Sequence, residues 1–151
     1  MNTHLFNGDI RKDSPRVQLM GEIDEAMAYI NLSRLYIDDN NISNLLGMIY
    51  ADLANVCSIC SNDMAKGRVD SRFIDWNLEE WENVRLDSFV TFNKYGSAIL
   101  NVARTIIRRA ERTSISLVET NELDKSILHY LNNLSKLVFY IGAEVEKNGM
   151  S

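Results

Sequence analysis

Apolar residues recur at helical spacing through most of this chain, which contains a single proline, Pro15. The clearest run lies from Ile42 to Met64, where an i, i+3, i+4, i+7 pattern gives a helix one apolar face. Proline inside a helix removes a hydrogen bond, so its scarcity favours long helices. No segment alternates with the period of a strand at comparable strength. The sequence therefore predicts an all-α fold, a bundle of about five helices in a single domain over residues 1–151.

Capping residues and apolar runs give the expected boundaries. Ser14 is a suitable N-cap with Pro15 in the first helical position, and Gly67 is expected to end the second helix. Residues 1–13 are predicted to be irregular, and residues 87–94 to form a loop that carries aromatic side chains. The expected helices run over about 15–36, 42–66, 71–84, 95–116 and, from Thr120 or Asn121, to about 148.

The chain is acidic, with a formal net charge of −5 and a pI near 5.0. That balance argues against non-specific binding to nucleic acid or to an anionic membrane. No N-terminal apolar run follows a basic segment, and no stretch of about 18 apolar residues exists, so neither a signal peptide nor a membrane span is expected. Two cysteines cannot form a disulfide framework, so we expect a cytoplasmic protein.

Three arginines form the most distinctive polar pattern. Arg104, Arg108 and Arg112 are spaced four apart, so on a helix they form one stripe beside an apolar face that includes Ile106 and Ile107. Guanidinium groups in a row repel one another unless carboxylates or an anion lie among them. Arginine suits such an anion because its planar fork makes two hydrogen bonds to phosphate or carboxylate. A solvated charged face with ion pairs to neighbouring helices is the alternative.

Other chemistry-bearing residues form no complete site. Cys57 and Cys60 fall on the apolar stripe of the second helix, and the two histidines of the chain do not complete a zinc set with them, so packing in the core is favoured. Trp76 and Trp81 are expected in the core or at a subunit interface. No glycine-rich phosphate loop, Ser-His-Asp set or HExxH motif occurs.

Asp24 is an acidic residue whose expected position calls for a cationic partner. It lies within the first predicted helix, and a carboxylate in a helix–helix seam is costly unless it is paired. Arg104 is its natural partner if the first and fourth helices touch. That pair could shape a site or be purely structural.

Four segments, in order along the chain, resemble the PduO-type ATP:cob(I)alamin adenosyltransferases. Residues 103–112 (ARTIIRRAER) are most similar, matching the signature ARTxxRRAER. Residues 12–17 (KDSPRV) resemble the lysine-containing approach to the first helix of that family. Residues 21–25 (GEIDE) resemble its G-x-[IV]-D-E-L-N, and residues 130–135 (YLNNLS) resemble its YLNRLSD. The order and spacing of the four segments indicate homology.

The resemblance implies a five-helix bundle that assembles as a homotrimer and binds ATP with Mg²⁺ at the subunit interface. Such an enzyme transfers the 5′-deoxyadenosyl group of ATP to the cobalt of cob(I)alamin, its second substrate, and releases triphosphate. A corrinoid reductase is an implied partner, and no protein metal ligand is implied. The residues carried over as ATP or cofactor contacts are Lys12, Arg108, Glu111, Arg112 and Asn132. Asp24 and Arg104 would form the ion pair that shapes the corrinoid side, and with Arg108 they make up the implied catalytic set.

The chain departs from the family pattern at several positions. The TGDxGxT segment that wraps the ATP phosphates is reduced to Gly8-Asp9, too close to Lys12, so this N-terminal ATP loop has diverged. The FxLPGG turn is replaced by FVTFNKYG, where Phe89 or Phe92 is the candidate aromatic beside the corrinoid. Further replacements are Ala26 and Met27 for Leu-Asn, Asn133 for an arginine and Lys136 for an aspartate.

The leading hypothesis is therefore an ATP:cob(I)alamin adenosyltransferase with a reduced ATP site. The diverged loop motivates an alternative of another class, a catalytically inactive homologue that binds corrinoid or nucleotide without adenosyl transfer. A third hypothesis is a helical oligomer that acts only as a partner-binding module, which would bind neither ATP nor corrinoid.

Overall fold

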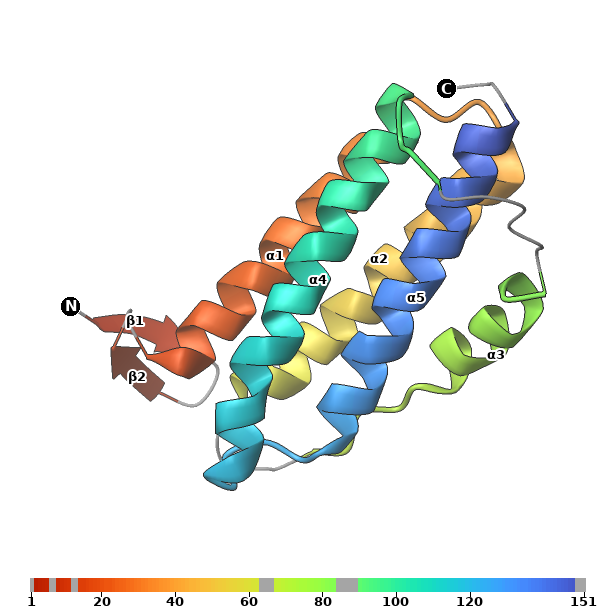
Figure 1. Cartoon of the computed structure of the whole chain (residues 1–151). Helices are drawn as coiled ribbons and strands as arrows, with labels where there is room; N and C mark the ends of the chain where they lie inside the picture. Colours follow the sequence, from red (N-terminus) through yellow and green to blue (C-terminus); the bar gives the residue numbers. More distant parts are fainter. Residues whose placement is uncertain (1, 6–7, 12–13, 63–66, 84–89, 149–151) are drawn as a thin grey trace.

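The computed structural model describes residues 2–5, 8–11, 14–62, 67–83 and 90–148. Helices make up most of this part of the chain (Figure 1). Their bounds are α1 Pro15–Arg34, α2 Asn40–Ser61, α3 Arg72–Trp81, α4 Tyr95–Glu119 and α5 Ser126–Lys147. The four long helices run side by side, with α4 between α1 and α5, and the short α3 packs on α5 (Figure 1). The predicted bundle of five helices is confirmed.

A small antiparallel hairpin precedes the bundle. β1 Asn2–Leu5 pairs with β2 Gly8–Arg11, with Asn2 opposite Arg11 and Leu5 opposite Gly8. The prediction that residues 1–13 are irregular is therefore wrong for these two strands. Each strand has 4 residues, too few for a period of two to stand out in the sequence. The hairpin lies at the end of the bundle where α1 begins (Figure 1).

The first two helices begin with side-chain caps. The hydroxyl of Ser14 accepts a hydrogen bond from the backbone N–H of Val17 at 3.3 Å, and Pro15 occupies the first position of α1 as predicted. Asp39 caps α2, because its Oδ1 accepts from the N–H groups of Asn41 at 2.9 Å and Ile42 at 3.2 Å. Each cap satisfies N–H groups that lack a partner inside the helix.

Helix α2 ends earlier than predicted. Its last residue is Ser61 rather than a residue next to Gly67, because Asn62 adopts an extended backbone with φ −93° and ψ 101°. The hydroxyl of Ser61 turns back to donate to the carbonyl of Ser58 at 2.7 Å. Short polar side chains of this kind compete with the helix for backbone groups, which favours termination.

The connection between α4 and α5 also differs from the prediction. Asn121 does not start the last helix but ends α4, in the left-handed region at φ 61°. The N–H of Glu122 donates to the carbonyl of Leu117 at 2.8 Å and that of Asn121 to Val118 at 3.0 Å, the two bonds of a Schellman motif. Helix α4 therefore extends to Glu119, beyond the predicted end near residue 116, and α5 starts at residue 126.

The core fills the space among the four long helices. Its members are almost fully buried aliphatic side chains, among them Leu19, Ile23, Ile30, Leu46, Ile49, Leu53, Leu100, Ile107, Leu131, Leu134, Val138 and Ile141. Tyr130 is buried among them and donates its hydroxyl hydrogen bond to Oδ2 of Asp52 at 2.7 Å, which joins α5 to α2. Desolvation raises the pKa of both the Asp52 carboxyl and the Tyr130 hydroxyl.

Arg16 joins three elements at one end of the bundle. Only 3% of the residue is exposed. Its Nη1 donates to the carbonyl of Cys60 at 2.6 Å and its Nη2 donates to that of Glu122 at 2.9 Å. The guanidinium thus satisfies backbone acceptors at the end of α2 and in the α4–α5 connection, and fixes the start of α1 against both.

Within the described part of the chain, α2 is long and apolar enough to cross a membrane by length and composition. A single helix of this kind is weak evidence, because a core helix can pass the same test. One stripe of α2 packs in the core through Ile42, Leu46, Ile49, Leu53, Val56 and Cys60.

Candidate functional site

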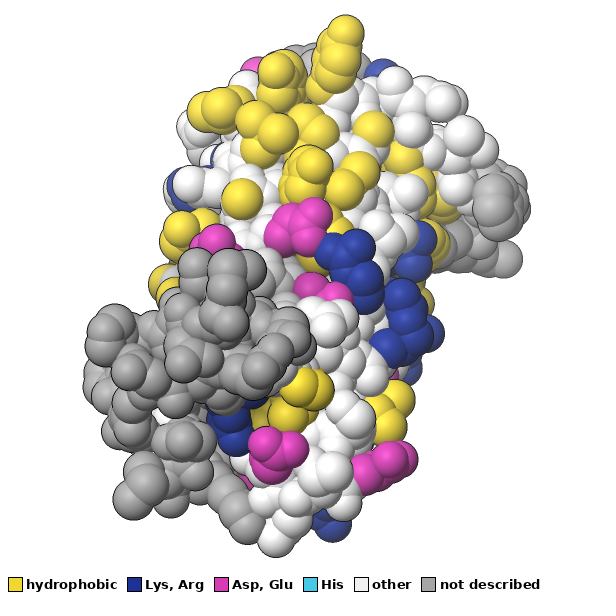
Figure 2. Space-filling model, turned by 90° about the vertical axis from the view of Figure 1, so that its left-hand side faces the viewer, with side chains coloured by type: hydrophobic (Ala, Val, Ile, Leu, Met, Phe, Trp, Pro, Cys, Tyr) yellow, Lys and Arg dark blue, Asp and Glu magenta, His cyan; other side chains and the backbone are white. Residues whose placement is uncertain are grey.

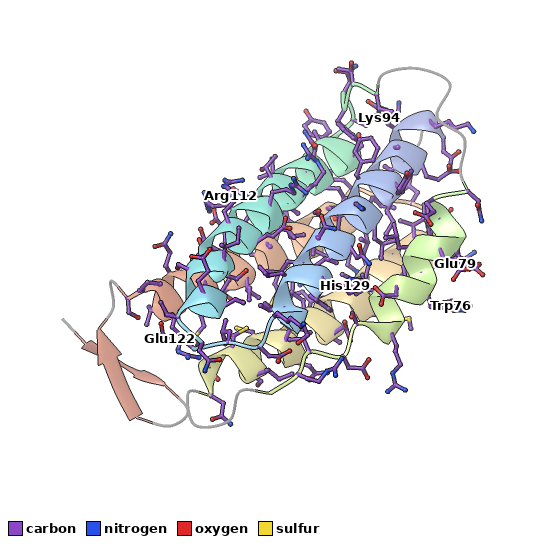
Figure 3. All side chains as sticks on the ribbon, turned by 60° about the horizontal axis from the view of Figure 1, so that its bottom comes forward. Trp76, Glu79, Lys94, Arg112, Glu122 and His129 are labelled. Atoms are coloured by element: carbon purple, nitrogen blue, oxygen red, sulfur yellow. The ribbon has the colours of Figure 1, made fainter. Side chains whose placement is uncertain are left out.

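The arginine stripe lies on α4, and its members Arg104 and Arg108 lie at the edge next to α5. Arg104 is half-buried, whereas Arg108 and Arg112 are exposed, and Arg112 projects from the surface of α4 (Figure 3). The apolar face beside the stripe is buried as the spacing predicts, through Ala103, Ile106, Ile107 and Ala110. The helix therefore docks by this face while the guanidinium groups keep access to solvent.

Three of the predicted ATP-contacting residues come together across α4 and α5. Nη1 of Arg108 lies 3.5 Å from Oε1 of Glu111, one turn along α4, and donates to Oδ1 of Asn132 on α5 at 3.4 Å. The ion pair and the hydrogen bond are both long, so the guanidinium is held in place but keeps capacity to bind an anion. Arg112 has no ion pair among the described residues and remains a candidate only by its position on the stripe.

A groove of about 380 Å³ continues from this cluster along α4 and α5. Its lining comprises Glu82, Arg104, Arg108, Ser135, Lys136, Phe139 and Tyr140. The lining thus includes three cationic side chains, one carboxylate and two aromatic rings. An electropositive groove with an aromatic wall suits a ligand that carries both a negative charge and a flat ring system.

Phe92 reaches this region from the segment before α4. Its ring packs edge-to-face on Phe139, with 5.8 Å between centroids, and its Cε1 lies close to the backbone of Gly142. A Cβ at position 142 would lie 3.2 Å from that atom, so glycine allows the close approach. Because Phe139 lines the groove, Phe92 supports its aromatic wall. Two other predicted site residues, Phe89 and Lys12, lie outside the described residues.

The predicted ion pair between Asp24 and Arg104 does not form within the described part of the chain. Helices α1 and α4 do pack together, but Asp24 is exposed, and Arg104 lines the groove beside α5. The Nε of Arg104 donates to Oδ1 of Asn101, one turn earlier on α4, at 2.9 Å. Glu22 faces α4 instead, and side chains two apart on a helix diverge by about 200°. The prediction of an intrachain pair is therefore wrong.

Arg109, which lies outside the stripe, forms the ion pairs of the α1–α4 seam. Its Nε donates to Oε2 of Glu22 at 2.9 Å, and its Nη2 donates to Oε1 of Glu25. The side chain of Glu22 is 6% exposed, and its Oε1 has no hydrogen-bond partner among the described residues. The spacing of Glu22 and Glu25, i and i+3, was the available sequence signal for this pair.

The cysteines lie on the core side of α2. Cys60 is buried and Cys57 partly buried, and both are free thiols. Burial raises the pKa of Cys57 and raises that of Cys60 to about 12, so both are protonated at neutral pH. Their predicted role as packing residues fits this environment. Of the tryptophans, Trp76 is 62% exposed, which rules out a core position for it.

Comparison with known proteins identifies the family. The model of the cobalamin adenosyltransferase family matches residues 1–145. The chain belongs to the cobalamin adenosyltransferase family. It is 30% identical over 150 residues to the corrinoid adenosyltransferase of Bacillus subtilis (strain 168), covering 91% of this chain and 77% of the relative. It is 31% identical over 156 residues to that of Mycobacterium tuberculosis (strain ATCC 25618 / H37Rv), covering 93% and 80%.

Solved structures show the same fold. A variant of the PduO-type ATP:corrinoid adenosyltransferase of Lactobacillus reuteri, complexed with cobalamin and ATP, superposes with a TM-score of 0.85 at 20% identity, covering 99% of this chain and 91% of that one. Another variant of that enzyme, complexed with ATP, gives a TM-score of 0.83 at 22% identity and covers 97% and 89%. The expected family and its helical fold are thus confirmed.

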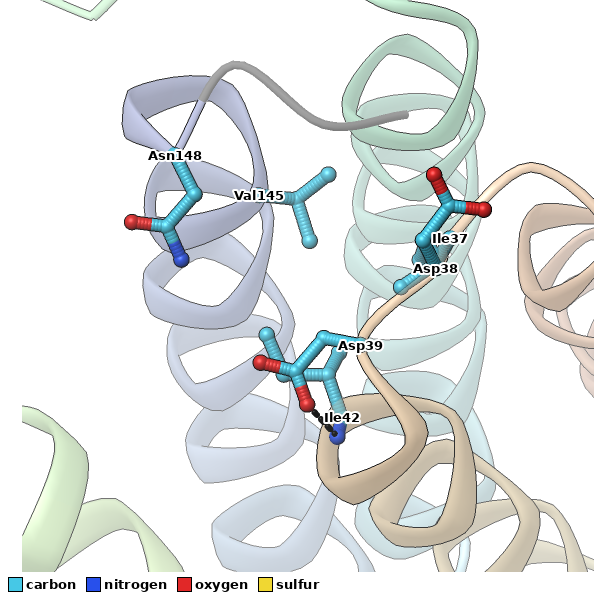
Figure 4. Close-up of a pocket in the computed structure, with 6 residues that line it drawn as sticks. All are labelled: Ile37, Asp38, Asp39, Ile42, Val145 and Asn148. Atoms are coloured by element: carbon cyan, nitrogen blue, oxygen red, sulfur yellow. Dashed lines mark hydrogen bonds between the residues drawn. The ribbon is translucent and has the colours of Figure 1, made fainter.

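A second hollow in this family member lies at the far end of the bundle, between the α1–α2 connection and the end of α5 (Figure 4). It has a volume of about 220 Å³ and is lined by Ile37, Asp38, Asp39, Ile42, Val145 and Asn148. The carboxylate of Asp39 is occupied by the α2 cap, as the dashed line to Ile42 shows (Figure 4). Its lining includes the carboxylates of Asp38 and Asp39 and no cationic side chain, which makes it a poor site for an anionic ligand.

Proposed function

We propose that this protein is an ATP:corrinoid adenosyltransferase that uses cob(I)alamin or a related corrinoid. In this reaction the cobalt(I) lone pair attacks C5′ of ATP. The Co–C bond forms as the C5′–O bond breaks, and triphosphate leaves with the electron pair. The observation that carries the proposal is the Arg108–Glu111–Asn132 cluster at an electropositive groove, in a chain of this family.

The reaction requires the protein to align C5′ of ATP with cobalt and to stabilise the developing charge. It needs no general base, because cobalt(I) is already a strong nucleophile. Arg108 is proposed to bind the triphosphate as negative charge develops on the leaving oxygen. Glu111 and Asn132 orient its guanidinium, and Asn132 offers an amide to the nucleotide. Lys12 and Arg112 are proposed as further phosphate contacts.

The corrinoid is proposed to lie at the Arg104 end of the groove. Phe139 and Tyr140 line the groove there, and Phe92 packs behind Phe139, so an apolar wall faces the flat macrocycle. An apolar surface next to the cobalt keeps water away from a strongly reducing centre. Phe89 is proposed as a second aromatic contact from the same segment.

Mg²⁺ is proposed to enter as its complex with ATP. The described residues include no group of three or more His, Cys, Asp or Glu side chains placed to hold a metal ion. Magnesium is commonly held through substrate phosphates and water with few protein ligands. The metal therefore counts here as part of the nucleotide substrate.

We also propose a homotrimer. Hydrophobic side chains gather on the upper part of the α1–α4 face, and this patch includes exposed Leu32, Leu35, Tyr36, Tyr95 and Val102 (Figure 2). Exposed apolar patches of this kind often mark contacts between proteins. In a cyclic trimer each contact joins two different faces, so Asp24 of one chain and Arg104 of the next are proposed to form the pair that cannot form within one chain.

A cytoplasmic location and a corrinoid reductase as partner complete the proposal. Cobalt(I) must be generated by reduction before transfer, and it is rapidly lost to oxidants. A reducing compartment and a nearby reductase meet that requirement, and the two free cysteines suit such a compartment.

The first test is spectroscopic. Cob(I)alamin generated anaerobically is mixed with protein and magnesium ATP, and conversion of its absorption band to that of adenosylcobalamin is followed. Conversion that requires both protein and ATP supports the proposal and shows that the diverged ATP loop is dispensable. Ligand binding without conversion by folded protein would instead favour the inactive binding homologue.

Arg108→Ala should reduce adenosyl transfer at least 100-fold, because removing one preorganised donor from a charge-stabilising site typically costs on the order of 100-fold in kcat. The fold should survive, since the side chain is exposed and its contacts are long. Arg72→Ala is the matched control, because Arg72 is exposed on α3 and pairs with Asp70 outside the groove. Unchanged turnover in Arg108→Ala would refute the assigned role.

A further inference from the structure

Lys136 faces the same groove as the arginine stripe. It lies on α5 one turn beyond Asn132, so the two side chains share a face of the helix. It lines the groove together with Arg104 and Arg108 of α4. Its side chain is exposed, and it forms no ion pair with any of the described residues. A mobile cation is thus available at the groove without a fixed partner.

The positive charge of the groove is only partly neutralised. The hydrogen bond of Arg104 goes to the neutral amide of Asn101, and Arg108 is shared between Glu111 at 3.5 Å and Asn132 at 3.4 Å. Glu82 is the carboxylate among the lining residues that the structure describes. Cationic side chains that line the same groove repel one another, and an anion bound between them removes that repulsion.

We propose that Lys136, beside Arg108, binds a phosphate-type anion of a substrate in this groove. The inference rests on the proposed function, which supplies substrates that carry phosphate. It deepens that proposal by adding a binding residue on α5. No glycine-rich loop motif occurs in the sequence, so side-chain cations must provide more of the charge that backbone N–H groups would otherwise supply.

Two substrates could supply the anion. One is ATP, through its triphosphate, and the other is the corrinoid, through a phosphate on its peripheral side chain. Both offer oxygen acceptors to an ammonium group, so the chemistry of recognition is the same. The experiment therefore needs one arm for each source.

The nucleotide arm uses inorganic tripolyphosphate as probe, measured by titration calorimetry at low and high salt. If ATP is the source, Lys136→Gln should weaken binding about tenfold at low salt, the expected loss for one charge-assisted contact. The difference should shrink at high salt because the contact is exposed. Lys147→Gln is the matched control, since Lys147 is also exposed on α5 but does not line the groove.

The corrinoid arm compares cobinamide phosphate with cobinamide, whose difference is the phosphate. If the corrinoid is the source, Lys136→Gln should weaken binding of the phosphorylated form about tenfold and leave the other unchanged. The corrinoid absorption spectrum reports binding in both cases. Loss of affinity in either arm supports the inference and identifies the source. Unchanged affinity in both arms, relative to Lys147→Gln, overturns it.

These outcomes are separate from those that test the proposed function. Both arms measure equilibrium binding, so they give an answer even if no adenosylcobalamin is formed. Conversely, wild-type adenosyl transfer with unchanged binding in Lys136→Gln would leave the enzyme assignment intact and refute the role of Lys136 alone.

Discussion

Neighbouring arginines on α4 have different surroundings. Arg108 points to the groove with two long contacts, whereas Arg109 pairs with the buried carboxylate of Glu22 and with exposed Glu25. One residue of sequence turns a helical side chain by about 100°, which is enough to move it from the groove to the α1–α4 seam. The proposed binding role of Arg108 and the structural role of Arg109 are therefore separable by mutation.

Arg109→Ala should lower the free energy of unfolding by about 2 kcal/mol, because it leaves the buried carboxylate of Glu22 without its cation. Glu25→Ala removes only the exposed ion pair between Glu25 and Arg109, and it should lower the free energy of unfolding by about 0.5 kcal/mol. Urea unfolding measures both. Adding Glu22→Gln to Arg109→Ala should recover much of the loss. Equal effects of the two single changes would mean that burial of Glu22 adds nothing.

At the scale of the elements, close approaches fix how α4 meets its neighbours. The start of α4 lies against the α1–α2 connection at Gly96, where there is no room for a side chain. At the other end, the Schellman turn and the carbonyl contacts of Arg16 fix the exit of α4. Arg104 and Arg108 of the groove are thus carried on a helix that is held at both ends.

Gly96→Ala should destabilise the fold by about 1–3 kcal/mol, since overpacking forces the neighbours to shift. The added Cβ would lie 2.8 Å from Cγ1 of Ile37 and 3.2 Å from the carbonyl oxygen of Tyr36. Gly21→Ala is the matched control inside α1, where nothing lies within 4 Å, and it should stabilise by about 0.5–1 kcal/mol. Thermal unfolding that ranks the two variants in the opposite order would contradict this packing.

The contact between α2 and α5 should give a characteristic pH dependence. Desolvation raises the pKa of Asp52 above 3.8, so the folded chain keeps this proton at pH values where the unfolded chain has lost it. The contribution of Asp52 to the free energy of unfolding therefore falls as pH rises from 3.8 through the folded pKa. At pH values above that pKa, the cost of burying the ionised carboxylate remains.

Asp52→Asn removes the titrating group but keeps an oxygen that can accept the hydrogen bond of Tyr130. The stability of the variant minus that of the wild type should therefore be larger near neutral pH than near pH 3. Urea unfolding of both proteins over this pH range tests the prediction. Taking the difference between them cancels the contributions of the other acidic residues. A difference that does not change with pH would show that Asp52 is not desolvated enough to matter.

At the scale of the whole molecule, the proposed trimer joins two different faces of the chain. The electropositive groove and the apolar patch of the α1–α4 face lie on different parts of one chain. A cyclic assembly joins unlike faces, so it can complete a site that one chain presents only in part. The unpaired positions of Asp24 and Arg104 are the local reason to expect this.

Val102→Glu should dissociate the proposed trimer, because it places a charge in the proposed contact, where Val102 is 40% exposed in the single chain. Trp76→Glu is the control, since Trp76 is 62% exposed on α3, away from that face. Sedimentation velocity gives the mass of each variant. Dissociation by Trp76→Glu alone would move the interface to α3, and a monomeric wild type would refute the trimer.

The sequence by itself determined the helices, most of their starts and the family, because periodicity, caps and the ARTIIRRAER segment are local in the chain. It also brought out Arg108, Glu111 and Asn132, which the fold brings together. It misassigned Asn121, whose side chain suits a helix start as well as a left-handed helix end. Local pattern cannot decide between those two, because the surrounding hydrogen bonds make the choice.

Only the tertiary structure decided which charges meet. Asp24 and Arg104 looked like partners, yet the rotation of α1 against α4 pairs Glu22 with Arg109 instead. Likewise, Lys136 and Phe139 became groove residues only through the packing of α5 on α4. The physical reason is that a helix pattern fixes which residues share a face, while the neighbour of that face depends on how whole helices pack.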